Sequence, residues 1–226
     1  MASHSPKEDL FQKHYAEISA LLEQFLTSVV NNGNYIDAET ALIGYIVDMY
    51  SEVFLGEVDY ILEVMGFNTT PADIIEIRNG VDTSAFMRSN RGRLREILDA
   101  HVWEIQSLLE QQKDLLTKEE IIELYKNKME RLALSETQMG IEKASVQSAK
   151  LFEEVTGDLI NKTWNCVGDS RTCPTCLAMN GVTIPVTESF SAVAPSVDIV
   201  EQLSYTGGDI VYAHPRCRCW VTYSKA

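Results

Sequence analysis

The sequence predicts an α+β fold that is mostly α, with an N-terminal helical region followed by a small β-rich C-terminal lobe. From residue 8 to about residue 30, apolar residues recur at intervals of three and four, the spacing of one buried helix face, and separate helix patterns follow as far as about residue 155. After Gly157 the composition shifts to β-branched and aromatic residues that favour short strands. All five cysteines lie in this last part, between residues 166 and 219. We therefore expect helices first and a cysteine-rich lobe with strands second.

Length and composition are typical of a globular protein. The 226 residues are 45% apolar and 8% aromatic, so the chain can bury a core as one domain or two small ones. Its longest apolar runs, such as residues 41–47, are far shorter than the roughly 20 residues that a membrane span needs. We expect a soluble, intracellular-type protein with no membrane partner.

Acidic residues are concentrated in the first 160 positions. The chain has 19 basic and 33 acidic residues, a net charge of −14, and residues 161–226 hold five of each sign. Because an acidic surface repels phosphate backbones, the helical region is not expected to grip nucleic acid. One basic cluster interrupts it, namely Arg88, Arg91, Arg93 and Arg95. We interpret this cluster as a salt-bridged helix face and keep a DNA contact as its alternative.

Two long helices are expected at the start of the chain. The apolar spacing predicts one over residues 8–30, and the Asn-Asn-Gly-Asn segment at 31–34 ends it, because Asn and Gly tolerate a left-handed backbone. Asp37 can cap the second helix, whose apolar residues run to Met65. This second helix is apolar enough to pack on two neighbours.

Shorter helices are expected between residues 70 and 110. The Thr-Pro pair at the start of 70–78 predicts a helix that begins there and ends at Arg78. Another short helix opens at residues 83–84. The Ser-Asn-Arg-Gly segment at 89–92 predicts a break before a helix over 93–110.

Helix signals resume after residue 117. Thr117 and Glu120 have the spacing of a capping box, which predicts a helix over residues 118–134. A second helix, rich in Ala, Ser and Gln, is expected over 136–155. Gly157 closes it.

Short strands and one long loop are expected in the C-terminal part. The strand signals lie at residues 163–167, 182–184 and 220–223. Asn180 and Gly181 form a hairpin-turn dipeptide. Residues 185–209 lack periodicity and predict a surface loop, and a loop of that length in a compact domain needs an anchor or a function.

Four cysteines and one histidine form two clusters at the ends of this loop, Cys173 with Cys176, and His214 with Cys217 and Cys219. Short Cys-x-x-Cys and His-x-x-Cys steps each supply two ligands, and a structural zinc ion takes four in tetrahedral geometry. We therefore predict that zinc staples the C-terminal lobe and anchors the loop. Five candidates compete for four positions, and the sequence leaves open which four bind.

Two further expectations concern the spacing within the second cluster and the fifth cysteine. If residues 217–219 are extended, both of their cysteine sulfurs point to the same face. Either His214 or one of those two cysteines then lies beside the ion rather than on it. Cys166 is expected to be a buried apolar residue in a strand, next to Trp164.

Other uses of the cysteines fit the sequence less well. A disulfide framework suits a small secreted domain, whereas this chain is long and begins with polar residues. A thioredoxin-like pair precedes a long helix, but Gly181 follows Cys176 by only five residues. A nucleobase-deaminase site needs an upstream His-x-Glu, and His101 and Glu104 have the wrong spacing.

Three blocks in the C-terminal half carry a family resemblance. Residues 131–138 read Arg-Leu-Ala-Leu-Ser-Glu-Thr-Gln, residues 164–181 run from Trp through Asp-Ser-Arg-Thr-Cys-Pro-Thr-Cys to Gly, and residues 214–219 read His-Pro-Arg-Cys-Arg-Cys. In order and spacing they resemble the R-x-A-x-T-E-T, W-x-x-x-x-D-x-R-T-C-x-x-C-x-x-L-x-G and H-P-x-C-R-C blocks of the phage Mu F-like minor head protein family, also called the phage head morphogenesis family. Ser135 stands where the family has Thr, and Met179 where it has Leu. The connection between the last two blocks is longer here than is usual in the family.

The resemblance implies a domain organisation and a function. It divides the chain into a helical, acidic region at 1–117 and a Mu F-like domain at 118–226, with helices over 118–157 and the zinc lobe over 158–226. It implies a non-catalytic minor capsid protein of the virion that binds the portal protein and the major capsid or other head proteins. This binding takes place in the host cytoplasm during assembly, and a part in DNA packaging or ejection is also implied.

Two other function classes stay open. A zinc-dependent hydrolase or nuclease needs an open position on the metal and a base such as Asp169 or Asp209, whereas four Cys and His ligands fill the coordination sphere. A zinc-ribbon adaptor that binds a protein partner is the other. In the non-catalytic interpretation, Asp169 holds a turn and Arg171 pairs with a carboxylate or a carbonyl.

Overall fold

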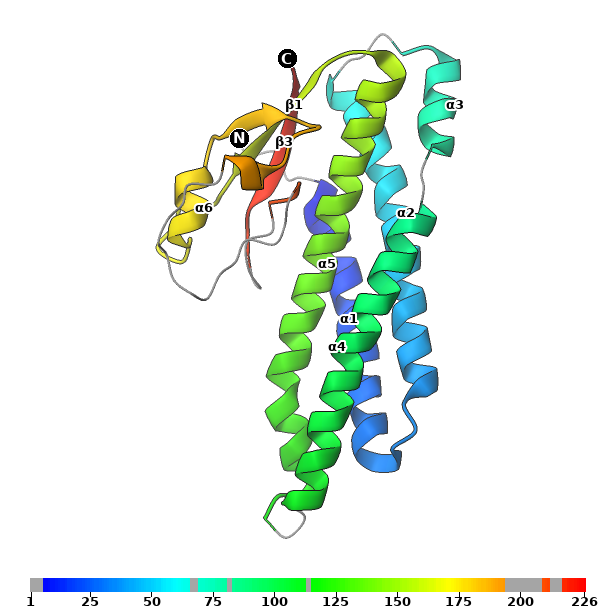
Figure 1. Cartoon of the computed structure of the whole chain (residues 1–226), viewed down its shortest axis with the longest axis vertical. Coiled ribbons are helices and arrows are strands. Elements are labelled where there is room, and N and C mark those ends of the chain that lie inside the picture. Colours follow the sequence, from blue (N-terminus) through cyan, green and yellow to red (C-terminus); the bar gives the residue numbers. More distant parts are fainter. Residues whose placement is uncertain (1–5, 66–68, 81–82, 113–114, 194–208, 212–216) are drawn as a thin grey trace. The chain divides into compact units, whose positions relative to one another are not determined.

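The computed structural model describes residues 6–65, 69–80, 83–112, 115–193, 209–211 and 217–226 (Figure 1). The protein is mostly helical and carries a small three-stranded antiparallel sheet in its C-terminal part, which confirms the predicted α+β fold. Within these ranges, no helix has both the length and the apolar character of a membrane span.

In the part of the chain that the structure describes, five helices precede the sheet: α1 (Pro6–Asn32), α2 (Ile36–Met65), α3 (Pro71–Asn79), α4 (Thr83–Gln111) and α5 (Lys118–Thr156). The chain forms two compact units, one of residues 1–49 with 82–137 and one of residues 50–81 with 138–226. The division therefore falls within α2 and α5, each of which contributes residues to both units.

The first unit contains α1, α4, the start of α2 and the first part of α5. Its core is a set of apolar side chains spaced by three and four along these helices. They include Ile18, Leu22, Phe25, Leu26, Val29, Leu42, Ile46, Leu94, Leu98, Ile105, Ile121 and Met129. Gly33, with φ of 67°, ends α1 as predicted. The predicted capping box starts α5, because the Glu120 N–H donates to Thr117 Oγ1 (3.2 Å) and the Thr117 N–H donates to Glu120 Oε2 (2.7 Å).

The predicted break at residues 89–92 is wrong, since α4 runs through it as one helix. Asn90 and Leu94 are buried on the core face, so packing holds the backbone helical there. An ion pair between Arg93 and the buried Glu136 adds a further tie. A helical glycine at position 92 costs about 1 kcal/mol relative to alanine, which these contacts offset.

The predicted gap between two helices near residue 135 is also absent, because α5 is continuous. The hydroxyls of this segment bond within the helix. Ser135 Oγ donates to the Arg131 carbonyl (2.7 Å), and Thr137 Oγ1 donates to the Ala133 carbonyl (2.8 Å). Polar residues that suggested a boundary are therefore satisfied inside one helix.

The arginine cluster of α4 is partly engaged in ion pairs. Arg93 pairs with Glu136, and Arg95 Nε donates to Glu39 Oε1 (2.8 Å). Both carboxylates are buried. The salt-bridged interpretation thus accounts for two of the four arginines, while Arg88 and Arg91 are exposed.

The second unit contains the rest of α2 and α5, the short α3 and the sheet. Helix α3 begins at the predicted cap, where the Asp73 N–H donates to Thr70 Oγ1 (3.2 Å) and the Thr70 N–H donates to Asp73 Oδ2 (2.7 Å). Gly157, with φ of 73°, ends α5 and turns the chain toward the sheet.

The sheet has the order β2-β1-β3, with β1 (Ile160–Asn165) in the centre, β2 (Thr183–Pro185) and β3 (Trp220–Lys225) on its edges (Figure 1). Both pairings are antiparallel, and Lys162 faces Ile184 on one side and Tyr223 on the other. The three predicted strands are confirmed, with β1 beginning earlier than expected. Alternate residues of β1, starting at Ile160, are buried.

The predicted hairpin turn at residues 180–181 connects a helix to a strand instead. Cys173 caps a short helix, α6 (Pro174–Met179). Pro174 occupies the first helical position, which proline suits. Asn180 (φ −59°, ψ 125°) and Gly181 (φ 80°) then form a type II turn closed by the Val182 N–H and the Met179 carbonyl (2.9 Å). The predicted loop over 185–209 lies partly outside the described residues, and its first part contains a 3-10 turn, η1 (Phe190–Ala192).

Candidate metal centre

The C-terminal lobe has a hydrophobic core of its own. It consists of Trp164, Cys176, Met179, Ile184, Phe190, Val211, Cys217, Cys219 and Val221. The rings of Trp164 and Phe190 meet edge to face with centroids 5.3 Å apart, an arrangement favoured by the aromatic quadrupoles. Three of the five cysteines thus belong to this core, and Cys166 and Cys173 pack at its edge.

The two predicted sulfur clusters converge in this core. The sulfurs of Cys176, Cys217 and Cys219 all lie within 4.8 Å of one another, and all three residues are buried. Cys176 Sγ and Cys217 Sγ are 3.8 Å apart although 41 residues separate them in sequence. Within the described residues, this is the one group of three potential metal ligands, and it could hold a metal ion.

Local backbone structure brings each sulfur to this point. Helix α6 places Cys176 in its first turn, facing the core. On the other side, Cys217 and Cys219 are buried while Arg218 between them is exposed. This alternation is the extended arrangement predicted for residues 217–219, with both sulfurs on one face.

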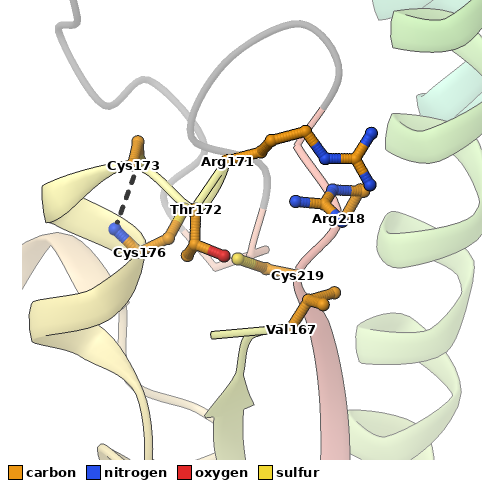
Figure 2. Close-up of a pocket in the computed structure, with 7 residues that line it drawn as sticks. All are labelled: Val167, Arg171, Thr172, Cys173, Cys176, Arg218 and Cys219. Atoms are coloured by element: carbon orange, nitrogen blue, oxygen red, sulfur yellow. Dashed lines mark hydrogen bonds between the residues drawn. The ribbon is translucent and has the colours of Figure 1, made fainter. Parts of the chain in front are cut away.

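Cys173 borders the same centre. A small cavity of about 10 Å³ is lined by Val167, Arg171, Thr172, Cys173, Cys176, Arg218 and Cys219 (Figure 2). That volume is about the size of one water or one metal ion. Cys173 Sγ accepts a hydrogen bond from the Cys176 N–H (3.3 Å), which fixes the sulfur at the start of α6.

Of the other sequence predictions for this region, the one for His214 is not tested and the one for Cys166 is wrong. His214 lies outside the described residues, so its place at the centre stays a prediction. Cys166 is half-buried rather than buried, and it follows the last residue of β1 instead of lying in the strand. Its N–H donates to Asn180 Oδ1 (3.0 Å), because the chain has already left the sheet to begin the turn that leads to α6.

The surroundings of the Cys176 and Cys219 thiols raise the pKa of both. Hydrogen bonds with Cys217 and Cys219, and then burial, raise the pKa of the Cys176 thiol. For Cys219, the hydrogen bond with Cys176 lowers the pKa, but the interaction with Cys217 together with burial outweighs it and the pKa is raised. A bound divalent cation reverses this balance, because thiolates are the binding form and release their protons on binding.

Two groups, one from α5 and one from β1, interact with Cys219. Gln138 Nε2 donates to the Cys219 carbonyl (3.3 Å) and to Glu142 Oε1 (3.2 Å). An interaction with Trp164 lowers the pKa of Cys219, the effect of an N–H donor near sulfur. Such groups orient ligands at metal sites. The motif spacing did not predict Gln138, since its contact depends on how α5 packs against the lobe.

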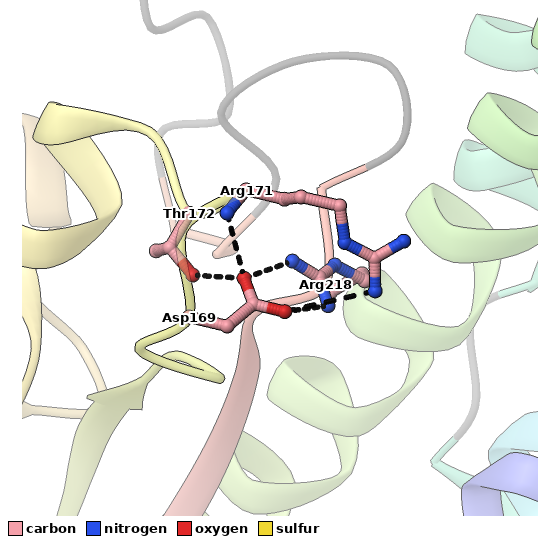
Figure 3. Close-up of polar contacts among 4 residues, drawn as sticks. All are labelled: Asp169, Arg171, Thr172 and Arg218. Atoms are coloured by element: carbon pink, nitrogen blue, oxygen red, sulfur yellow. Dashed lines mark hydrogen bonds and ion pairs between the residues drawn. The ribbon is translucent and has the colours of Figure 1, made fainter.

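Asp169 holds the turn before α6, as predicted. Its Oδ1 accepts hydrogen bonds from the Arg171 N–H (3.0 Å) and from Thr172 Oγ1 (3.2 Å) (Figure 3). Arg218 donates to both carboxylate oxygens, from Nη1 at 2.8 Å and from Nη2 at 2.6 Å. The hydrogen bond from Arg218 is the largest of the contacts that hold the pKa of Asp169 well below its usual range. Arg171 also pairs with this carboxylate (3.6 Å), as predicted, but Arg218 is its main partner.

Asp209, the second acid considered as a base, is also engaged. Its carboxylate forms an ion pair with Lys150 of α5. Its carbonyl accepts a hydrogen bond from Lys162 Nζ (3.1 Å). Both acids that a hydrolytic mechanism would use are therefore occupied by cationic side chains.

Comparison with protein-family models, curated proteins and solved structures found no match to this chain. The resemblance to the Mu F-like family accordingly stays a prediction. In the structure, Cys176 from the second of the three blocks lies close to Cys217 and Cys219 from the third.

Proposed function

We propose that this chain is a non-catalytic phage head-assembly protein, a minor capsid component whose C-terminal lobe is held together by a structural zinc ion. The observation that supports it most is the meeting of Cys176 with Cys217 and Cys219. These residues belong to two separate blocks of the Mu F-like resemblance, and a shared metal explains why both blocks carry closely spaced cysteines.

Zinc is the metal that fits the donor set best. Closely grouped thiolates in a dry core suit a tetrahedral ion with soft ligands, and such closed sites are structural. We assign the fourth position to Cys173, because it lines the small cavity together with Cys176 and Cys219. In this assignment His214 is not one of the four ligands.

Cobalt substitution tests this assignment. Co²⁺ bound by four thiolates absorbs more strongly in the sulfur charge-transfer region than Co²⁺ bound by three thiolates and one imidazole. We expect Cys173→Ser to reduce that absorption and weaken binding, and His214→Ala and the control Cys166→Ser to leave both unchanged. A reduced affinity in His214→Ala with an unchanged Cys173→Ser would assign the fourth position to His214.

A non-catalytic role is supported by the state of the nearby acids. A catalytic zinc keeps one position open for water and needs a base close to it. Asp169 is bound by Arg218, and Asp209 by Lys150. A hydrolase or nuclease would have to break one of these ion pairs to gain its base, so this alternative has less support than a structural site.

The partners follow from the resemblance: the portal protein and the major capsid or other head proteins, met in the host cytoplasm and retained in the virion. A DNA contact through the arginines of α4 is not part of the proposal, because Arg93 and Arg95 already pair with buried carboxylates. A zinc-ribbon adaptor of another assembly would share the same lobe and differ only in its partner.

Co-purification with a candidate portal ring tests the assembly role. We expect full-length protein to elute with the ring on size-exclusion chromatography, and the Cys176→Ser variant to elute with it less. A protein that never associates with portal or capsid components, while binding zinc normally, would favour the adaptor alternative.

A further inference from the structure

One ion pair joins the two segments that supply the sulfurs. Asp169 lies four residues before Cys173, and Arg218 lies between Cys217 and Cys219. Their contact is bidentate, with Nη1–Oδ2 and Nη2–Oδ1 distances of 2.8 and 2.6 Å, across 49 residues of sequence (Figure 3). It therefore ties the start of one ligand-bearing segment directly to the middle of the other.

Each partner of this pair is also held in place within its own segment. The Asp169 carboxylate is held by the Arg171 N–H and by the Thr172 hydroxyl, within the turn that leads to Cys173. Arg218 is flanked by two buried cysteines, which determine the face on which its side chain emerges. Parallel hydrogen bonds between a guanidinium and a carboxylate also define a single orientation, which a lysine at the same position could not do.

We propose that Asp169 and Arg218 are positioning residues that bring the two cysteine segments together and so set the affinity of the metal site. The proposal rests on the metal centre described above. Without the ion pair, the pairing of β1 with β3 and the core packing still join the two segments, but residues 169–173 and 217–219 are ordered less tightly, and the entropy of ordering them is subtracted from the metal-binding free energy. With the ion pair in place, the sulfurs already lie in register. Groups that orient metal ligands in this way typically change affinity by about 10–100-fold.

The alternative is that this is an ordinary surface ion pair with little effect. Both side chains are about one-third exposed, and isolated exposed pairs contribute little. The lobe offers a matched comparison in Lys225 and Asp158, whose ion pair (3.0 Å) is more exposed and whose residues lie at least six positions in sequence from any cysteine. Removing the Lys225–Asp158 pair removes a similar surface contact and leaves the Asp169–Arg218 pair intact.

The experiment measures the zinc dissociation constant of full-length protein by competition with a chromophoric chelator. We expect Arg218→Gln to weaken zinc binding by about 10–100-fold, Arg218→Lys to give an intermediate loss because it keeps the charge but not the fork, and Lys225→Gln to match the wild type. A combined Asp169→Arg and Arg218→Asp variant, which restores an opposite-charge pair, should recover part of the loss. Circular dichroism of the zinc-saturated variants checks that each retains the fold.

The outcomes separate this inference from the metal site itself. If the wild-type protein binds zinc and Arg218→Gln binds it equally tightly, the positioning role of the ion pair is overturned. The proposed zinc site itself is not affected by that result. Equal losses in Arg218→Gln and Lys225→Gln would also overturn the positioning role, since any surface pair would then have the same effect. Wild-type protein that binds no zinc would overturn both proposals.

Discussion

At the scale of single residues, Lys162 is the most unexpected side chain of the lobe. It lies in the central strand β1 and is fully buried on the same face as the apolar residues Ile160 and Trp164, where a charged side chain is unexpected. Its Nζ donates to the Asp209 carbonyl (3.1 Å) and lies 5.0 Å from the centre of the Phe190 ring. These contacts compensate only in part, and burial lowers the pKa of Lys162 to about 8.

This lowered pKa predicts a specific dependence of stability on pH. The folded state holds the Lys162 proton less tightly than the unfolded state, whose pKa is near 10.5. Below about pH 8 both states are charged and the burial cost is fully present. Between about pH 8 and 10.5 the folded state loses its proton first, so the cost diminishes as pH rises. We expect Lys162→Met to be more stable than wild type at pH 7, with an advantage that shrinks by on the order of 3 kcal/mol by pH 10.5.

Chemical denaturation of both proteins across this pH range measures the difference. Subtracting the wild type from the variant removes the titration of tyrosines and cysteines common to the two. An advantage that is the same at pH 7 and pH 10.5 would mean that the lysine is not desolvated as described.

At the scale of the elements, the start and stop signals located most helices. The capping box of Thr117 and Glu120 and the left-handed Gly157 act locally, so their effect is visible in the sequence. The continuity of α4 through Gly92 depends instead on tertiary contacts, including the Arg93–Glu136 ion pair, which no local signal encodes.

The same distinction applies to the metal centre. The grouping of Cys173 with Cys176, and of Cys217 with Cys219, follows from short-range spacing and could be predicted. That Arg218 is the main partner of Asp169 depends on how segments 49 residues apart meet, which no spacing rule fixes. Burial of Lys162 was missed for the same reason, since a strand pattern does not say which polar residue faces the core.

Two glycine substitutions test the element boundaries in opposite directions. A Cβ added at Gly92 meets no atom within 4 Å, and the residue is helical, so Gly92→Ala should stabilise α4 by about 1 kcal/mol. Gly157 has φ of 73°, so Gly157→Ala should destabilise the protein by about 1–2 kcal/mol. Thermal unfolding of the two variants against wild type measures both. A destabilising Gly92→Ala would support a break in α4 at that position.

At the scale of the whole molecule, the helices and the C-terminal lobe are held together in different ways. The helical cores rest on apolar side chains such as Leu22 and Phe25 in the first unit and Phe54 and Phe152 in the second. The lobe has a three-stranded sheet with short edge strands and a core that includes three thiols. A lobe with so small a core needs an additional crosslink to be stable, and the proposed zinc ion provides it.

Chelation should therefore act on one part of the chain. We expect a strong zinc chelator to expose residues 158–226 to limited proteolysis while the far-ultraviolet helical signal stays largely intact. Fragments sequenced after digestion locate the cleavage sites. Cleavage that spreads equally through α1 and α4 would contradict a metal whose effect is confined to the lobe.

The zinc content of purified full-length protein, measured by mass spectrometry of the metal, tests the central claim most directly. We expect about one zinc per chain in the wild type, with loss of the metal in Cys176→Ser and retention in Cys166→Ser. Wild-type protein purified without chelators that contains no zinc, and takes up none when it is supplied, would contradict it.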